Sequence, residues 1–159
     1  MRVVFMCGPA GSGKSTVARR FEAEGMMRLS FDQEAWDRGF RAMPLPDGAR
    51  SEIDAELRRR LVELVGQDRD VVLDFSFWSR AMRDDWRRLL APLGVTPETV
   101  YLATDRRTCL ERVRARALGH GDDFMLDPGV AAAYFDHFEV PSPEEGPLRV
   151  IPGGTDASA

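Results

Sequence analysis

The sequence predicts an α/β fold, a three-layer sandwich in which helices cover both faces of a five-stranded parallel sheet. Short apolar runs alternate along the chain with longer stretches of helical periodicity, which is the order that parallel sheets require. The first apolar run ends in a glycine-rich loop that leads into a helical pattern. A length of 159 residues suits one domain. We therefore expect one layered domain with its functional site built inside it.

Five short runs are expected to be strands, and the first of them is a continuous apolar run, rich in β-branched residues, that ends at a glycine, as in a strand buried on both faces. In chain order they are residues 3–7, 27–31, 71–75, 99–102 and 148–151. Gly8, Asp32 and Asp74 fall at or next to the carboxyl ends of the first three runs. Since ligands of open parallel sheets bind at the carboxyl ends of the strands, these three residues mark the expected site.

Between the runs, the chain carries signals for helix ends. Ser51 and Ser79 are expected N-caps, Asp127 and Pro128 have the N-cap and N1 pattern, and Gly94 is an expected stop. The expected helices cover about residues 15–24, 51–66, 80–93, 105–118 and 128–138. The third of these would bury Met82, Trp86, Leu89, Leu90 and Leu93.

The remaining segments divide into one domain, residues 1–151, and a loose tail, residues 152–159. Within the domain, residues 33–50 are rich in glycine, proline and aromatic residues. We expect them to form an irregular insert rather than regular structure.

Composition excludes several classes of protein. The net charge of −4 gives no global basic field for nucleic acid. No apolar run is long enough for a secretory signal or a membrane span. Cys7 and Cys109 lie far apart without a metal-ligand or redox spacing, which favours reduced thiols in a cytoplasmic protein.

Residues 8–15, GPAGSGKS, match the P-loop pattern G-x-x-x-x-G-K-[ST] between an expected strand and an expected helix. Glycines let successive backbone N–H groups turn inward, and the helix N-terminus adds partial positive charge. Lys14 would reach the β- and γ-phosphates of ATP, the Ser15 hydroxyl would bind Mg²⁺, and Thr16 would face the α-phosphate. The predicted nucleotide-binding residues are Gly8, Ala10, Gly11, Ser12, Gly13, Lys14, Ser15 and Thr16.

Lys14 is also the only lysine in the chain, which favours a position where arginine would fail. A GTPase that reads guanine with an N-K-x-D segment is excluded, because no second lysine exists. The length argues against a RecA-like or AAA+ motor, so a small kinase is the class that the residues favour.

At these residues the sequence resembles the short P-loop kinases and phosphotransferases, a family that includes chloramphenicol phosphotransferase, zeta toxins, gluconate kinase and the kinase domain of polynucleotide kinases. The segments that carry the resemblance are, in order, GPAGSGKST, LSFD, VVLDFSFWSR, CLERVRAR and FEVPSPEE. The resemblance implies a P-loop NTPase fold of the nucleoside-monophosphate-kinase type that transfers phosphate from ATP with Mg²⁺.

The resemblance also implies roles for residues outside the P-loop. Asp32 would accept the proton of the attacking hydroxyl, with the alternative that it only caps a short helix over residues 33–37. Asp74 would bind Mg²⁺ through water or hold the acceptor. Arg112 and Arg116, in a lid over residues 112–127, would neutralise the transferring phosphate, with a solvated basic face as the alternative.

Other side chains have two uses that the sequence does not separate. Arg80 and Arg83 either grip an anionic acceptor or face water. Four aromatic residues either stack on an acceptor or pack in the core; they are Trp36, Phe40, Phe77 and Trp78. A small-molecule hydroxyl acceptor is the main prediction. A 5′-hydroxyl polynucleotide kinase and an ATP-binding regulator without an acceptor are the alternatives, and the sequence indicates neither the acceptor nor the oligomeric state.

Overall fold

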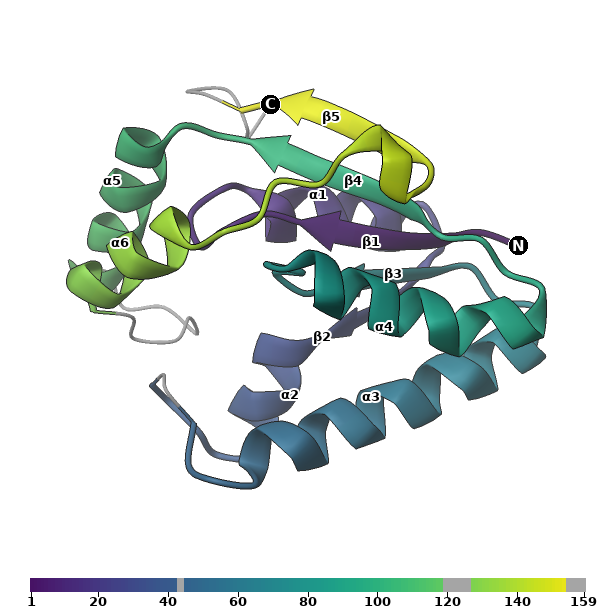
Figure 1. Cartoon of the computed structure of the whole chain (residues 1–159). Helices are drawn as coiled ribbons and strands as arrows, with labels where there is room; N and C mark the ends of the chain where they lie inside the picture. Colours follow the sequence, from purple (N-terminus) through teal and green to yellow (C-terminus); the bar gives the residue numbers. More distant parts are fainter. Residues whose placement is uncertain (43–44, 119–126, 154–159) are drawn as a thin grey trace.

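The computed structural model describes residues 1–42, 45–118 and 127–153, and its centre is a parallel sheet with strand order β2-β3-β1-β4-β5 (Figure 1). The strands are β1 (Val3–Cys7), β2 (Met27–Ser30), β3 (Val71–Asp74), β4 (Glu98–Ala103) and β5 (Leu148–Pro152). All four neighbouring pairs run parallel. The predicted five-stranded parallel sheet is therefore confirmed.

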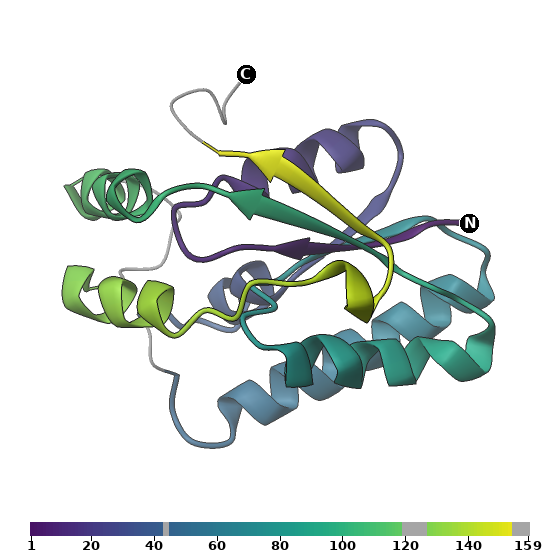
Figure 2. The same ribbon diagram turned by 45° about the horizontal axis from the view of Figure 1, so that its top comes forward.

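Helices cover both faces of this sheet. They are α1 (Lys14–Ala23), α2 (Phe31–Asp37), α3 (Ala49–Gly66), α4 (Arg80–Leu90), α5 (Arg106–Leu118) and α6 (Pro128–Asp136), with short 3₁₀ turns η1 (Ala91–Leu93) and η2 (Pro143–Glu145). Helix α1 lies on one face, and α3 and α4 lie on the other (Figures 1 and 2). Helices α5 and α6 pack against each other beyond the carboxyl end of β4.

The core consists of two apolar clusters separated by the sheet. All five residues of β1 are buried, and their side chains alternate between the clusters, as expected for a strand covered on both faces. The cluster under α3 and α4 contains stacked rings of Phe5 and Phe77, 4.4 Å apart, with Trp86 packed edge-on. The central strand is thereby fixed just before the glycine loop.

Two predicted caps are confirmed and one is wrong. The Ser79 hydroxyl accepts a hydrogen bond from the Met82 amide at 3.1 Å, and the Asp127 carboxylate accepts from Gly129. Helix α3, however, begins at Ala49 rather than after Ser51, because Gly48 takes a left-handed conformation (φ 82°) and starts the helix earlier. A cap signal in the sequence does not exclude an earlier start when a glycine precedes it.

The prediction of an irregular segment is wrong for residues 33–37, which belong to helix α2. Ser30 caps this helix by accepting the Gln33 amide at 3.1 Å, so Asp32 lies in the first turn and is not the cap. Helix α4 also departs from expectation, because Leu93 is 42% exposed. The change to the tighter 3₁₀ pitch at η1 rotates Leu93 away from the apolar face.

Some predictions lie outside the described residues. The middle of the proposed lid, residues 119–126, and most of the proposed tail, residues 154–159, belong to this group. None of the helices in the described ranges is long and apolar enough to cross a membrane.

Candidate nucleotide site

The loop between β1 and α1 has the backbone shape of a phosphate-binding loop. Gly11 and Gly13 have φ angles of 81° and 94°, in the left-handed region that favours glycine. The Ser12 amide donates to the Pro9 carbonyl at 3.1 Å and closes the turn. A Cβ on Gly11 would collide with the carbonyl oxygen of Cys109, so α5 packs directly on this loop.

The loop also fits the phosphates of a nucleotide. Gly13 caps helix α1 without a side chain, and the first amides of a helix have no intrahelical partner. Ser12 Oγ is fully buried, and within the described part of the chain it has no hydrogen-bond partner. Amides and a hydroxyl without acceptors at the positive end of a ten-residue helix suit an anionic ligand.

One predicted loop residue has a different use. The Gly8 amide donates to the Ser76 carbonyl at 3.0 Å, so it ties β1 to the segment after β3 and is not available to a phosphate. A Cβ on Gly8 would collide with Ser12 Oγ, which explains the need for glycine. Gly8 therefore shapes the loop.

The residues predicted to hold Mg²⁺ lie together. Lys14 and Ser15 are half-buried in the first turn of α1, and Thr16 is exposed. Ser15 Oγ donates a hydrogen bond to Asp74 Oδ1 at 3.3 Å. A hydroxyl beside a buried carboxylate at a phosphate loop is a donor set that suits Mg²⁺ carried by a nucleotide. These two residues would hold the ion, and the phosphates would complete its shell.

The sequence analysis missed the third member of this group, Arg28. Its guanidinium donates to Asp74 Oδ2 from Nε at 3.1 Å and from Nη2 at 2.7 Å. The Arg28 side chain is 11% exposed and the Asp74 side chain 2%. A signal existed, because Arg28 is a charged residue between the apolar Met27 and Leu29 of a short strand.

Asp32 lies at the same edge of the sheet. Strand β2 is the neighbour of β3, and Ser30 is the register partner of Asp74. Asp32, two residues further along, is exposed in the first turn of α2. The topology therefore brings Asp32 to the carboxyl edge that carries the P-loop and Asp74.

The two lid arginines differ in their surroundings. Arg112 Nη1 donates to the Gly11 carbonyl at 3.1 Å, so Arg112 is held against the P-loop. Arg116 is exposed one turn later. The lid segment that follows, residues 119–126, lies outside the described residues.

A further anchor of the P-loop comes from β4 and was not predicted. Thr104 Oγ1 donates to the Ser12 carbonyl at 2.7 Å, and Thr104 is 4% exposed. A Cβ on Gly153 would collide with Thr104, so the chain after β5 packs on the same point. A threonine at the end of a strand is too common a feature to reveal this contact from sequence.

Arg83 corrects both sequence interpretations, because it faces neither an acceptor nor water. Its side chain is fully buried and forms an ion pair with Glu145 at 2.8 Å. It also donates to the carbonyl oxygens of Phe77 at 2.7 Å and Glu139 at 2.9 Å. Arg80, by contrast, is exposed and pairs with Asp84.

The ionisation states around Arg83 follow from these contacts. Burial opposes the ionisation of Glu145, yet the hydrogen bonds from Arg83 and from the Ser142 amide outweigh it and lower the pKa of Glu145 to about 2. Burial raises the pKa of the nearby Cys7 thiol to about 12 despite the positive charge of Arg83. Cys7 and Cys109 are both free and buried. Glu145 is therefore charged and Cys7 neutral at neutral pH.

The four aromatic candidates separate into two groups. Phe77 is fully buried, and Phe40 packs against the same core, so the core interpretation holds for both. The guanidinium of Arg41 lies 3.7 Å from the centre of the Trp36 ring. Trp78 is 43% exposed in the segment after β3. Trp78 is thus the candidate whose ring is the more exposed, and its use for an acceptor stays a prediction.

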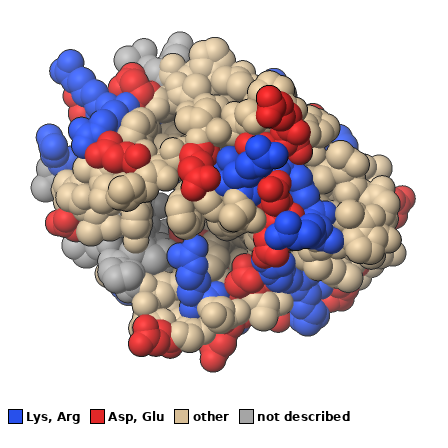
Figure 3. All heavy atoms as spheres, viewed as in Figure 1, with Lys and Arg blue, Asp and Glu red and all other residues tan. Residues whose placement is uncertain are grey.

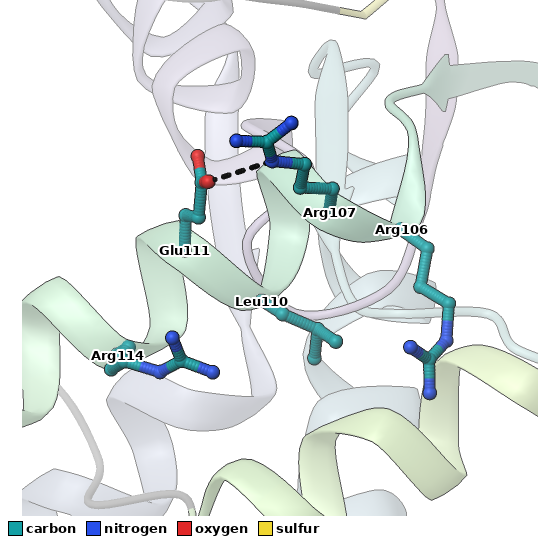
Figure 4. Close-up of a pocket in the computed structure, with 5 residues that line it drawn as sticks. All are labelled: Arg106, Arg107, Leu110, Glu111 and Arg114. Atoms are coloured by element: carbon teal, nitrogen blue, oxygen red, sulfur yellow. Dashed lines mark hydrogen bonds and ion pairs between the residues drawn. The ribbon is translucent and has the colours of Figure 1, made fainter.

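The larger of two described cavities, about 410 Å³, does not coincide with the P-loop. It is lined by Arg106, Arg107, Leu110, Glu111 and Arg114 (Figure 4). All five belong to α5, and Arg107 pairs with Glu111 at 3.1 Å. A second cavity of about 80 Å³ lies between Arg28 and α2. A hollow along one helix lacks converging groups, so we assign the site from the P-loop contacts instead.

Charges of both signs are interspersed over α3 and α4 on the face seen in Figure 3. Arg58, for example, pairs with Asp54 and Asp85, and Arg60 pairs with Glu34 and Glu56. These pairs make a solvated surface of low net charge.

The sheet order, the glycine loop and the Ser15–Asp74 contact define a P-loop NTPase with a kinase-like fold. More particularly, the chain belongs to the family described as "AAA domain", whose model matches residues 3–141. The length of the chain argued against an AAA+ motor, but it does not argue against membership of this family.

Two of the similar proteins are named as kinases. A cytidylate kinase of Natronomonas pharaonis is 31% identical over 141 residues, which cover 79% of this chain and 73% of the relative. A gluconokinase structure from Sinorhizobium meliloti 1021 has a TM-score of 0.67 at 22% identity, covering 99% of this chain and 85% of the other. A chain of the Pnkp1/Rnl/Hen1 RNA repair complex has a TM-score of 0.73 at 17% identity, covering 86% and 43%. The resemblance to small P-loop kinases is confirmed.

Proposed function

We propose that this protein is a cytoplasmic ATP- and Mg²⁺-dependent kinase that transfers the γ-phosphate to a hydroxyl of a small molecule. The observation that carries the proposal is the Ser15 to Asp74 contact of 3.3 Å beside a preformed phosphate loop. Asp32 at the neighbouring strand end supplies the carboxylate that a hydroxyl acceptor needs.

In this mechanism, the P-loop amides and Lys14 would bind the β- and γ-phosphates, and Ser15 and Asp74 would hold the metal ion. The bound ion would neutralise charge on the phosphates. The acceptor oxygen attacks the γ-phosphorus, the bond to the bridging β–γ oxygen breaks, and ADP leaves with that electron pair. Asp32 receives the proton of the acceptor hydroxyl, and Arg112 and Arg116 stabilise the negative charge.

The contacts of Arg83 remove it from the cations that could hold an anionic acceptor. A kinase for an anionic acceptor requires cationic groups to hold it. Arg83 is buried against Glu145, so it cannot serve that purpose, and the exposed Arg80 is paired with Asp84. The similarity to a gluconokinase structure supports a sugar-like acceptor.

The 31% identity to a cytidylate kinase supports a second candidate, transfer to the phosphate of a nucleotide. The two candidates differ in their need for a base, because a phosphate oxygen is already ionised at neutral pH whereas a hydroxyl must lose its proton. Asp32→Asn should therefore leave ATP binding intact and reduce transfer to a hydroxyl by at least about 10²-fold. A near-wild-type rate in Asp32→Asn would contradict the assignment of the base.

The test of the proposed function is ADP release from Mg·ATP with separate pools of acceptors: sugars, hydroxylated antibiotics, nucleosides, nucleoside monophosphates and 5′-hydroxyl oligonucleotides. Lys14→Ala serves as the blank, since it removes the charge at the phosphates. Stimulation by a hydroxyl pool would support the proposal, and stimulation by monophosphates alone would favour the second candidate. ATP binding without turnover in any pool would favour a regulator.

The oligonucleotide pool tests a 5′-hydroxyl polynucleotide kinase, which the similarity to the RNA repair complex supports. The mixed charges on α3 and α4 weigh against a phosphate-tracking surface there (Figure 3). Oligonucleotide binding that weakens steeply with added salt would favour this alternative.

A further inference from the structure

Arg28 has an unusual position for a charged side chain. It lies on the edge strand β2, where its register partner is Val72 and that of Ser30 is Asp74. Since side chains alternate along a strand, Arg28, Val72 and Asp74 share the face of the sheet that α1 covers. The guanidinium reaches along the strand to Asp74 and is only 11% exposed.

Both oxygens of Asp74 are committed. Oδ2 accepts two hydrogen bonds from Arg28, at 3.1 and 2.7 Å, and Oδ1 accepts the Ser15 hydroxyl at 3.3 Å. The carboxylate cannot rotate without losing bonds to a buried cation. Its Oδ1 is therefore held toward the residue that would share the metal ion.

The ion pair with Arg28 also offsets the negative charge of Asp74, which a free cation would need for binding. Arg28 and Asp74 together carry no net charge, and Lys14 adds a positive charge next to Ser15. In the described residues, no group of three or more His, Cys, Asp or Glu side chains could hold a metal ion. Without phosphates, the site offers a divalent cation one neutralised carboxylate and one hydroxyl.

We propose that Arg28 is a positioning residue that neutralises Asp74 in the nucleotide-free protein, so that a divalent cation enters this site only together with a nucleotide. The phosphates supply the missing negative charge, and Asp74 Oδ1 is already oriented when they arrive. This inference rests on the proposed function in one respect, the assignment of Ser15 and Asp74 to the metal ion.

The experiment measures Mn²⁺ binding to nucleotide-free protein from the loss of the electron paramagnetic resonance signal of free Mn²⁺. Wild type should show no binding up to millimolar Mn²⁺. Arg28→Met should bind Mn²⁺ at least about tenfold more tightly, because Asp74 regains its charge. Arg28→Lys should behave like wild type, and the double variant Arg28→Met/Asp74→Asn should lose the gained binding. Arg149→Met, an exposed site on the opposite edge strand β5, is the matched control and should not bind.

Adding ADP tests the site separately. In wild type, ADP should increase the amount of bound Mn²⁺ beyond the Mn·ADP complex that forms without protein, and the absence of this increase would argue against the proposed nucleotide and metal site. The inference about Arg28 would be overturned by submicromolar to micromolar Mn²⁺ binding in nucleotide-free wild type. It would also be overturned if a folded Arg28→Met variant, checked by circular dichroism, gained no binding. A purely structural Arg28 would lower stability without producing a new Mn²⁺ site.

Discussion

Two arginine–carboxylate pairs with little solvent exposure lie on opposite faces of the sheet. Comparing them distinguishes a contact that stabilises the fold from one that belongs to the candidate site. Arg28 and Asp74 lie on the face covered by α1, whereas Arg83 and Glu145 lie on the face of α4, where Arg83 also contacts Cys7. In the first pair, one carboxylate oxygen faces Ser15 at the P-loop. That oxygen is the one that we propose for the metal ion.

The second pair is closed. Glu145 accepts hydrogen bonds from Arg83, from Arg87 at 3.2 Å and from the Ser142 amide at 2.9 Å. Arg83 in turn holds two carbonyl oxygens in segments far apart in sequence. A closed pair joins α4 to the segment before β5 and has no capacity left for a ligand. We call Arg28 and Asp74 the open pair. We expect the closed pair to contribute to the stability of the fold and the open pair to contribute to catalysis.

The largest expected effect comes from breaking the closed pair. Arg83→Met leaves Glu145 buried without its main partner and should lower the free energy of unfolding by about 3–5 kcal/mol. Urea unfolding followed by circular dichroism measures this loss. The matched control is Arg80→Met in the same helix, which removes a 52% exposed side chain and should change stability by less than about 0.5 kcal/mol. Equal effects of the two substitutions would contradict the distinction between the pairs.

The open pair should show the opposite pattern. Asp74→Asn keeps the shape of the side chain but removes the charge that the metal ion requires, so phosphoryl transfer should fall by about 10²–10³-fold. Its free energy of unfolding should fall by only about 1–2 kcal/mol, through weaker bonds to Arg28. Single-turnover rates with Mg·ATP and urea unfolding give the two numbers. A large loss of stability with an unchanged rate of phosphoryl transfer would show that Asp74 supports the fold and not catalysis.

Acid should act mainly through the closed pair. The pKa of Glu145 is lowered to about 2, so its contribution to stability is present above its unfolded-state pKa and is lost as the pH falls toward 2. Glu145→Gln lacks this dependence. The difference in unfolding free energy between wild type and Glu145→Gln should shrink by about 2 kcal/mol between pH 6 and pH 3. A difference that stays constant over this range would show that Glu145 is not a charged partner of Arg83.

The comparison of the two pairs with the P-loop also shows which features could be predicted from the sequence. The P-loop and its flanking strand and helix were predictable, because all their signals lie within the contiguous residues 3–24. Ser15 and Asp74 were predictable as residues of one site, because Asp74 ends a strand and Ser15 begins the helix after the P-loop, whereas the role of Asp74 stayed open between the metal ion and the acceptor. Arg28 and Arg83 find their carboxylates 46 and 62 residues away, and only the packed fold decides which of the many acidic residues each one meets. Their roles could not be read from spacing.

The smallest expected effect concerns Thr104, an uncharged residue that holds the P-loop beside the open pair. Thr104→Val keeps the shape but removes the bond to the Ser12 carbonyl, 2.7 Å long in the folded protein. The loss of one buried hydrogen bond should lower the free energy of unfolding by about 1–2 kcal/mol. Because the affected carbonyl belongs to the P-loop, ADP should also bind several-fold more weakly in a calorimetric titration. Thr96→Val, at an exposed position before β4, is the matched control and should change neither quantity. If Thr104→Val lowered stability but left ADP affinity unchanged, the β4 anchor would belong with the closed pair as a support of the fold alone.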